Sequence, residues 1–299
     1  MKPNYTKTCT LPQDLIPLLR NRGLHIADEP KAIDYLSHIG YFRFSAYLYP
    51  LLKEPKNEHH YKDGATFEMA LNMYRFDRKL RILIFNEIEK IEVAIRSAMN
   101  NYISDGLHNV FWMTESRYFH NPVIFAKTLA QIQSELERTK EDFVLHFRHK
   151  YASAYPPAWM IAEILSLGTL VNLFNNLNQL SLRKKIARLF GLSLPVFSSW
   201  IVTLIGLRNA CCHHARIWNK EHSIVPIAPQ SPAFPWISDA AADMKRTYYR
   251  ICMIKYLLFT ISPHNTFTQK LSSLVAQYPT VDVRAMGFPA AWQDEPLWK

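Results

Sequence analysis

The stretch TFEMALNMYRFDRKLRILIFNEIEKIEVAIRSAMNNYISDG, residues 66–106, carries apolar side chains at about every third or fourth position. This spacing is typical of an amphipathic helix, because it places the apolar residues along one face. Thr66 is a suitable N-cap, and Gly106 is of a residue type that often ends helices. The stretch therefore predicts the longest regular element of the fold. Its apolar positions are Ala70, Met73, Tyr74, Leu80, Leu83, Ile84, Ile88, Ile91, Ala94 and Ile95.

Helical spacing also dominates on both sides of this stretch. Glycine is scarce, with 8 residues in 299, and no region shows the alternating pattern of strands. The sequence thus predicts an all-α protein. Further helices are expected over residues 11–22, 30–39, 121–150, 156–178, 181–190, 195–207, 238–261 and 265–277, with a buried aromatic segment at 41–52.

The order of helices and loops predicts three regions. Residues 1–64 form an N-terminal helical region that ends in a polar loop. Residues 65–222 form a helical core that contains the long helix and the motif described below. Residues 223–299 contain a proline-rich loop and C-terminal helices, which we expect to pack as one unit with the core.

The charge balance favours an anionic partner. The chain has 35 Lys and Arg against 25 Asp and Glu, a formal net charge of +10 at pH 7. Such an excess favours nucleic acid or an anionic membrane surface. No uninterrupted apolar run reaches the roughly 18 residues of a membrane span, and no signal peptide is visible. We therefore expect a cytoplasmic protein without a membrane partner.

The four cysteines, Cys9, Cys211, Cys212 and Cys252, form no recognisable disulfide framework. Cys211 and Cys212 are adjacent and precede two histidines, but no second ligand pair follows at a spacing that zinc sites use. We expect reduced cysteines, no metal and no other cofactor.

The sequence RNACCHH at residues 208–214 combines the groups that cut RNA without a metal. RNA supplies its own nucleophile, the 2′-hydroxyl. Histidine can transfer protons near neutral pH. Arginine binds phosphate oxygens with two parallel hydrogen bonds and keeps its charge. Arg208, Asn209 and His213 are therefore candidate catalytic residues, with His214 and Arg216 as supporting residues.

Spacing alone is weak evidence, because Arg20, Asn21 and His25 repeat the same pattern. Residues five apart on a straight α-helix also point about 140° away from each other. Arg208 and His213 can meet at one phosphate if the helix ends or distorts, if long side chains curl round it, or if a second copy supplies one group. An ion pair for Arg208, and a helix C-terminal role for the histidines, are the structural alternatives.

Two basic helical faces could contact RNA. Arg75, Arg78 and Arg81 follow one another at three-residue steps and would lie along one stripe of the long helix. Lys184, Lys185 and Arg188 lie in a short basic helix. A solvated surface with internal ion pairs remains the alternative for the long helix.

Four segments, in order, resemble the Abi-like family of bacterial phage-defence proteins, of the AbiD and AbiF type. They are HIGYFRFSAYLYPL (38–51), MYRFDRKLRILIFNEIEKIEVAIRS (73–97), YPPAWMIAEILSLGTLVNLFNNL (155–177) and LRNACCHHARIWN (207–219). The resemblance covers about residues 20–220. It implies a HEPN-like helical bundle, here with N-terminal and C-terminal helical additions.

The resemblance also implies a metal-independent endoribonuclease of abortive-infection type, with a composite site in a homodimer. Arg208 would hold the phosphate, Asn209 would orient it, and His213 would move the proton. Some relatives are restrained by a structured regulatory RNA, so such a partner is implied beside the RNA substrate. The alternative is a non-catalytic RNA-binding protein or scaffold, since the superfamily includes inactive members.

Overall fold

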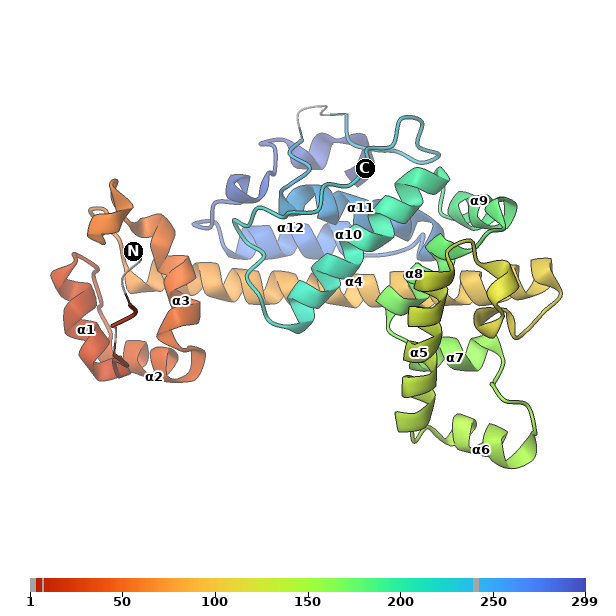
Figure 1. The fold of residues 1–299 in the computed structure, drawn as a ribbon. Helices are drawn as coiled ribbons and strands as arrows, with labels where there is room; N and C mark the ends of the chain where they lie inside the picture. Colours follow the sequence, from red (N-terminus) through yellow and green to blue (C-terminus); the bar gives the residue numbers. More distant parts are fainter. Residues whose placement is uncertain (1–3, 7, 239–241) are drawn as a thin grey trace. The chain divides into compact units, whose positions relative to one another are not determined.

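The computed structural model describes residues 4–6, 8–238 and 242–299, and within them the regular elements are all helical (Figure 1). The prediction of an all-α protein is confirmed at this level. The α-helices are α1 (Pro12–Asn21), α2 (Glu29–Ile39), α3 (Tyr41–Leu48), α4 (Phe67–Leu107), α5 (Pro122–Arg138), α6 (Asp142–Lys150), α7 (Ala158–Ile164), α8 (Leu167–Asn176), α9 (Leu180–Leu189), α10 (Leu194–Cys212), α11 (Thr247–Ile261) and α12 (Phe267–Gln277).

Short 3₁₀ turns complete these elements. They are η1 (Tyr49–Leu51), η2 (Lys56–Glu58), η3 (Trp112–Thr114), η4 (Ser116–Tyr118), η5 (Arg284–Met286), η6 (Trp292–Asp294) and η7 (Pro296–Trp298). The predicted proline-rich loop holds no regular element in its described part, up to residue 238.

Helix α4 is the predicted long helix, and it has 41 residues. The Oγ1 atom of Thr66 accepts a hydrogen bond from the backbone N–H of Met69 at 3.1 Å, which confirms Thr66 as its cap. Most of the predicted apolar positions are buried, whereas Tyr74, Leu83 and Ala94 are only half-buried.

The chain folds as two compact units. The first contains the described residues of 1–81 together with Leu271–Val283, so it extends past the expected end at residue 64 and includes the start of α4. Inside it, the carboxylate of Asp77 is fully buried and accepts hydrogen bonds from Tyr47 Oη, at 2.6 Å, and from Arg81. Phe44, Tyr47 and Leu48 confirm the buried aromatic segment in part, while Phe42 is exposed.

The second unit contains the described residues of 82–270 and Arg284–Lys299. Helix α10 lies at its centre and packs against α8, α9 and α11. Trp200 of α10 is fully buried and donates its indole N–H to the carbonyl of Ile227 at 2.9 Å, which fixes the proline-rich loop on this helix. Helix α11 therefore shares a core with the motif-bearing helix.

Three predicted helices are shorter than the sequence suggested. Residues 121–150 form two helices, because Thr139 Oγ1 accepts from the N–H of Glu141 at 3.3 Å and interrupts the helical ladder. Residues 156–178 also form two, since Ser166 leaves helical geometry to cap α8 through the N–H of Thr169 at 3.1 Å.

The third shortened helix is α11, which begins at Thr247 rather than at residue 238. Before it, Asp243 Oδ1 accepts from the N–H of Lys245 at 2.8 Å, a local turn that competes with helix. Residues 239–241 of the predicted helix lie outside the described residues.

Candidate functional site

The motif lies at the C-terminal end of α10, which ends in a left-handed turn. The N–H of His214 donates to the carbonyl of Cys211 at 3.1 Å, and the N–H of Ala215 donates to that of Ala210 at 2.8 Å. These two bonds form a Schellman motif, in which His214 takes the left-handed position at φ 56°. The motif therefore lies where the chain leaves the helix, and the side chains of His213 and His214 are exposed.

The helix stays regular up to this turn. The N–H of His213 still donates to the carbonyl of Asn209 at 2.9 Å, an ordinary α-helical bond. The angle of about 140° between the directions of Arg208 and His213 on one helix therefore stands. Of the arrangements considered above, the helix does end near Cys212, but it is not distorted before residue 213.

Arg208 is held by a carboxylate of α4. Its Nε lies 3.5 Å from Oε2 of Glu92, and its guanidinium carbon lies 6.0 Å from the ring centroid of Phe85. The Nε atom is buried and forms no hydrogen bond. The contact is thus an ion pair, and 38% of the Arg208 side chain stays exposed.

Glu92 is itself fixed from its other side. It accepts a hydrogen bond from Nη2 of Arg96 at 2.5 Å, and Nη1 of Arg96 donates to the carbonyl of Ala162. Glu92 is mostly buried, with 13% exposure, so its charge is balanced by the two arginines. The four-residue spacing of Glu92 and Arg96 on α4 is the sequence signal that indicates this pair.

The other two motif residues face the surface. Asn209 is exposed, and its Oδ1 lies 3.5 Å from Nη1 of Arg208, at the outer limit of a hydrogen bond. The side chain of His213 forms no hydrogen bond within the described chain. Arg216 donates from Nη1 to the carbonyl of Asn219 at 3.2 Å. The structure shows no direct contact between Arg208 and His213.

The repeated pattern near the N-terminus has a different environment. Arg20 pairs with Glu29 at 2.6 Å and donates to the carbonyl of Ile26 at 3.1 Å. Gly23 ends α1 at φ 90°, so His25 lies beyond the helix and bridges to Thr66. The guanidinium of Arg20 is therefore held by Glu29 and by the backbone carbonyl of Ile26.

The three arginines of α4 do not form the exposed stripe that their spacing predicted. Arg81 is 6% exposed and pairs with the buried Asp77, so this prediction is wrong for Arg81. Arg75 is half-buried between Tyr35 Oη, at 2.6 Å, and Glu68, at 3.1 Å. Arg78 alone of the three is exposed.

The basic residues of α9 are at the surface. Lys184, Lys185 and Arg188 are exposed, and the ammonium of Lys185 lies 4.9 Å from the ring centroid of Tyr102. Their proposed contact with RNA stays a prediction.

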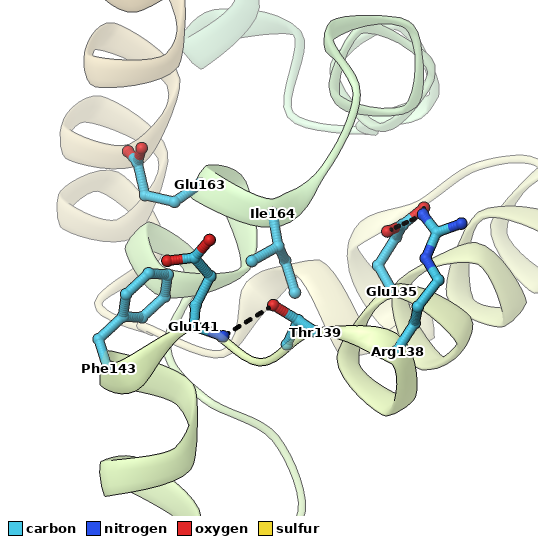
Figure 2. Close-up of a pocket in the computed structure, with 7 residues that line it drawn as sticks. All are labelled: Glu135, Arg138, Thr139, Glu141, Phe143, Glu163 and Ile164. Carbon is cyan, nitrogen blue, oxygen red and sulfur yellow. Dashed lines mark hydrogen bonds and ion pairs between the residues drawn. The ribbon is translucent and has the colours of Figure 1, made fainter.

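A cavity of about 490 Å³ lies elsewhere in the second unit, where α5, α6 and α7 meet (Figure 2). Glu135, Glu141 and Glu163 line it, and Arg138 is paired with Glu135 at 2.5 Å. An acidic lining repels RNA, so this cavity is a poor candidate for the functional site.

No three His, Cys, Asp or Glu side chains among the described residues of the chain are grouped to hold a metal ion, and the four cysteines are free. Helix α10 is long and apolar enough to cross a membrane by length and composition alone, with 44% of that window buried. The sequence expectation concerned uninterrupted apolar runs and did not identify this helix, because Ser, Thr and Gly interrupt its apolar residues.

The fold and the motif together define an all-α protein with a polar Arg–Asn–His motif at a helix end. A family profile described as Abi-like protein matches residues 34–219, more than half of the chain. The chain therefore belongs to the Abi-like family. No curated protein and no solved structure gave a significant match. The motif lies inside the matched range, whereas α11, α12 and the loop before them lie beyond it.

Proposed function

We propose that the chain is a metal-independent endoribonuclease of abortive-infection type, which acts in phage defence through a HEPN-like core. Membership of the Abi-like family supports the abortive-infection role. The observation that carries the enzymatic proposal is the arrangement at the end of α10. A half-exposed arginine is braced by Glu92, and an exposed asparagine and histidine follow it on the same helix end.

The chemistry assigns one task to each side chain. His213 moves a proton at the 2′-hydroxyl or at the leaving 5′-oxygen, a contribution on the order of 10²–10⁴ in rate. Arg208 stabilises the charge on the phosphorane, and Asn209 orients the phosphate. Attack of the 2′-oxygen on phosphorus breaks the bond to the 5′-oxygen. The products are a 2′,3′-cyclic phosphate and a 5′-hydroxyl.

We favour the arrangement in which the two groups come from different chains. Because Arg208 and His213 point about 140° apart on one helix, each scissile phosphate would take Arg208 from one copy and His213 from the other. Exposed apolar side chains on α4, one of which contacts Arg208, support self-association. Ile82, Phe85 and Val93 lie on α4 with exposures of 57%, 38% and 55%, and Phe85 contacts Arg208.

The test is cleavage of RNA in the presence of EDTA by wild type and by His213→Ala. We expect cleavage by wild type alone, with cyclic phosphate ends. A requirement for added magnesium would contradict the metal-free mechanism. Tight binding of RNA without any cleavage would favour the alternative, a non-catalytic RNA-binding protein.

A further inference from the structure

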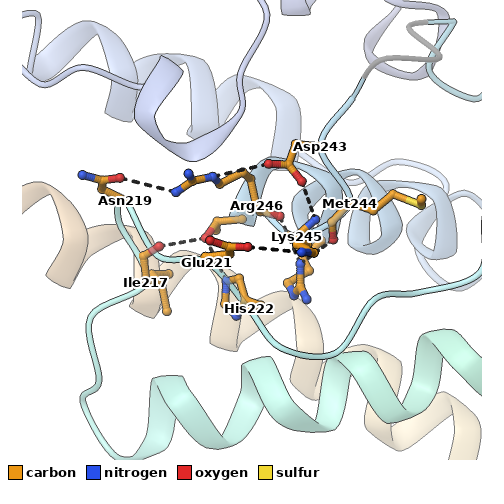
Figure 3. A network of polar contacts seen from close by, with 10 residues as sticks. Ile217, Asn219, Glu221, His222, Asp243, Met244, Lys245 and Arg246 are labelled. Atoms are coloured by element: carbon orange, nitrogen blue, oxygen red, sulfur yellow. Dashed lines mark hydrogen bonds and ion pairs between the residues drawn. The ribbon is translucent and has the colours of Figure 1, made fainter.

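The chain that follows the motif is fastened to the start of α11 (Figure 3). Thr247 Oγ1 donates to the carbonyl of Ile217 at 2.7 Å and lies 3.0 Å from Nε2 of His222. The N–H of His222 donates to the carbonyl of Lys245 at 2.9 Å. Arg250, which is 1% exposed, donates to the carbonyl of Ile224 at 2.5 Å. These bonds hold residues 217–224 beside residues 244–250.

These hydrogen bonds bring the guanidinium groups of Arg216 and Arg246 to Asn219. Arg216 donates to the backbone carbonyl of Asn219 at 3.2 Å, and Nη1 of Arg246 lies 3.5 Å from its side-chain oxygen. Asn219 takes a left-handed conformation, at φ 47°. Each guanidinium carries five N–H donors, and these contacts occupy only a few of them. Both side chains are only half-buried, so the remaining donors can reach a ligand.

Positive charge is in excess around these two arginines. The cationic side chains here are those of Arg216, Lys220, Lys245, Arg246 and Arg250. Two carboxylates offset part of this charge: Glu221 lies 3.4 Å from Lys245, and Asp243 lies 3.5 Å from Arg246. Burial, together with the charges of Arg250, Lys220 and Arg246, lowers the pKa of His222 to about 3. His222 therefore adds no charge near neutral pH, and among the described residues five cations face two carboxylates. Such an excess attracts an anion from solution.

The short chain between His213 and Arg216 keeps this group of cations close to the motif. Arg216 is three residues from His213, so their Cα atoms are at most about 11 Å apart. A strand of RNA that placed one phosphate at the motif would bring its neighbouring phosphates within reach of long cationic side chains.

We propose that Arg216, Lys220 and Arg246 form a subsite that binds phosphate groups of single-stranded RNA next to the cleaved bond. The proposal rests on the proposed function for its substrate, but the subsite itself is a binding feature. Guanidinium groups fork onto phosphate oxygens, and Lys220 acts as a point charge. Lys220 and Arg246 lie beyond the range matched by the family.

The experiment measures RNA affinity in a protein that cannot cut. A fluorescein-labelled 20-mer of oligouridylate is titrated with the full-length His213→Ala protein over a series of KCl concentrations. Lys220→Gln and Arg246→Gln are then added singly to this background. Lys127→Gln is the matched control, because Lys127 is an exposed cation on α5 with no role in the subsite.

Each subsite variant is expected to raise Kd several-fold and to reduce the slope of log K against log salt by about 0.7, the value for one lost phosphate contact in a single strand. Lys127→Gln should leave both unchanged. Equal Kd values and slopes in the subsite variants and the control would overturn the proposal, as would binding to phosphatidylglycerol vesicles but not to RNA.

Lys220→Gln decides the matter if Arg246→Gln does not fold, because Lys220 forms no hydrogen bond or ion pair within the described chain. Failure of the proposed function is read separately. If wild type cuts no RNA while the salt slopes change as expected, the nuclease proposal fails and the subsite stands. If wild type cuts RNA and the slopes do not change, the subsite fails alone.

Discussion

Oε2 of Glu92, on α4, lies 3.5 Å from Nε of Arg208, on α10. The other carboxylate oxygen of Glu92, Oε1, forms an ion pair with Nη2 of Arg96 at 2.5 Å. The carboxylate therefore occupies the Nε side of the Arg208 guanidinium and leaves its Nη groups toward Asn209 and solvent. An arginine held in this way loses less side-chain entropy when it binds phosphate, because its rotamer is already fixed.

Glu92→Gln should lower the rate of RNA cleavage about tenfold, the effect of losing roughly 1.4 kcal/mol from a charge-assisted contact. Glu92→Asp should recover part of the rate. Single-turnover cleavage measures both, and thermal melting reports the cost of leaving Arg96 unpaired. Glu89→Gln is the control, since Glu89 is an exposed carboxylate on the same helix. An equal loss in Glu89→Gln would show that only the net charge matters.

His213→Ala should reduce EDTA-resistant cleavage by on the order of 10²–10⁴ with an unchanged melting temperature, because the side chain is exposed. His25→Ala is the matched control, as His25 belongs to the repeated Arg–Asn–His pattern whose arginine is bound to Glu29. Mapping of RNA ends distinguishes the proposed 2′,3′-cyclic phosphate from other products. Retention of full activity in His213→Ala would remove this residue from the mechanism.

A mixture of Arg208→Ala and His213→Ala proteins should regain activity that neither has alone. With Arg208 and His213 supplied by different copies, each mixed dimer keeps one intact site of two. Half of the dimers are mixed at equal concentrations, so about a quarter of wild-type activity is expected. The measurement is cleavage after exchange of subunits. No recovery, despite mixed dimers seen by native mass spectrometry, would contradict a site shared in this way.

His222 predicts a loss of stability in mild acid. Its folded pKa of about 3 lies below the ordinary value of 6.5, so the unfolded chain binds a proton that the folded chain does not. Stability should therefore fall as pH decreases from about 6.5 toward 3. The melting temperature of His222→Gln should depend less on pH between 7 and 5 than that of wild type. The difference should correspond to the titration of one histidine. Identical pH profiles for the two proteins would show that His222 is not kept neutral by the fold.

Gly191→Ala should destabilise the second unit by about 1–3 kcal/mol. Gly191 has φ 68°, and an added Cβ would lie 2.6 Å from the ring of Phe234 and 3.1 Å from Tyr256 Oη. Gly206→Ala is the contrasting variant, since its Cβ would meet Ile224 at an ordinary 3.6 Å inside a helix. Thermal unfolding should separate the two variants. Similar stability in both would mean that the contact with Phe234 relaxes easily.

Local signals in the sequence located most helices of this protein. The cap at Thr66, the glycines after α1, α2 and α9, and the proline at the start of α10 act within a few residues of the ends that they specify. The breaks at Thr139 and Ser166 were missed, because a single side-chain hydrogen bond decides each one against a continuing helical pattern.

The sequence by itself determined the all-α class and the position of the Arg–Asn–His motif, since both follow from residue order and short-range spacing. Only the tertiary structure decided that Arg81 is buried against Asp77 and that Glu92 braces Arg208. It alone decided that Arg246 joins Arg216 at Asn219. The reason is physical: Asp77 and Arg81 are neighbours on α4, but their burial depends on what packs over that helix, while the partners of Arg208 and Asn219 come from other segments.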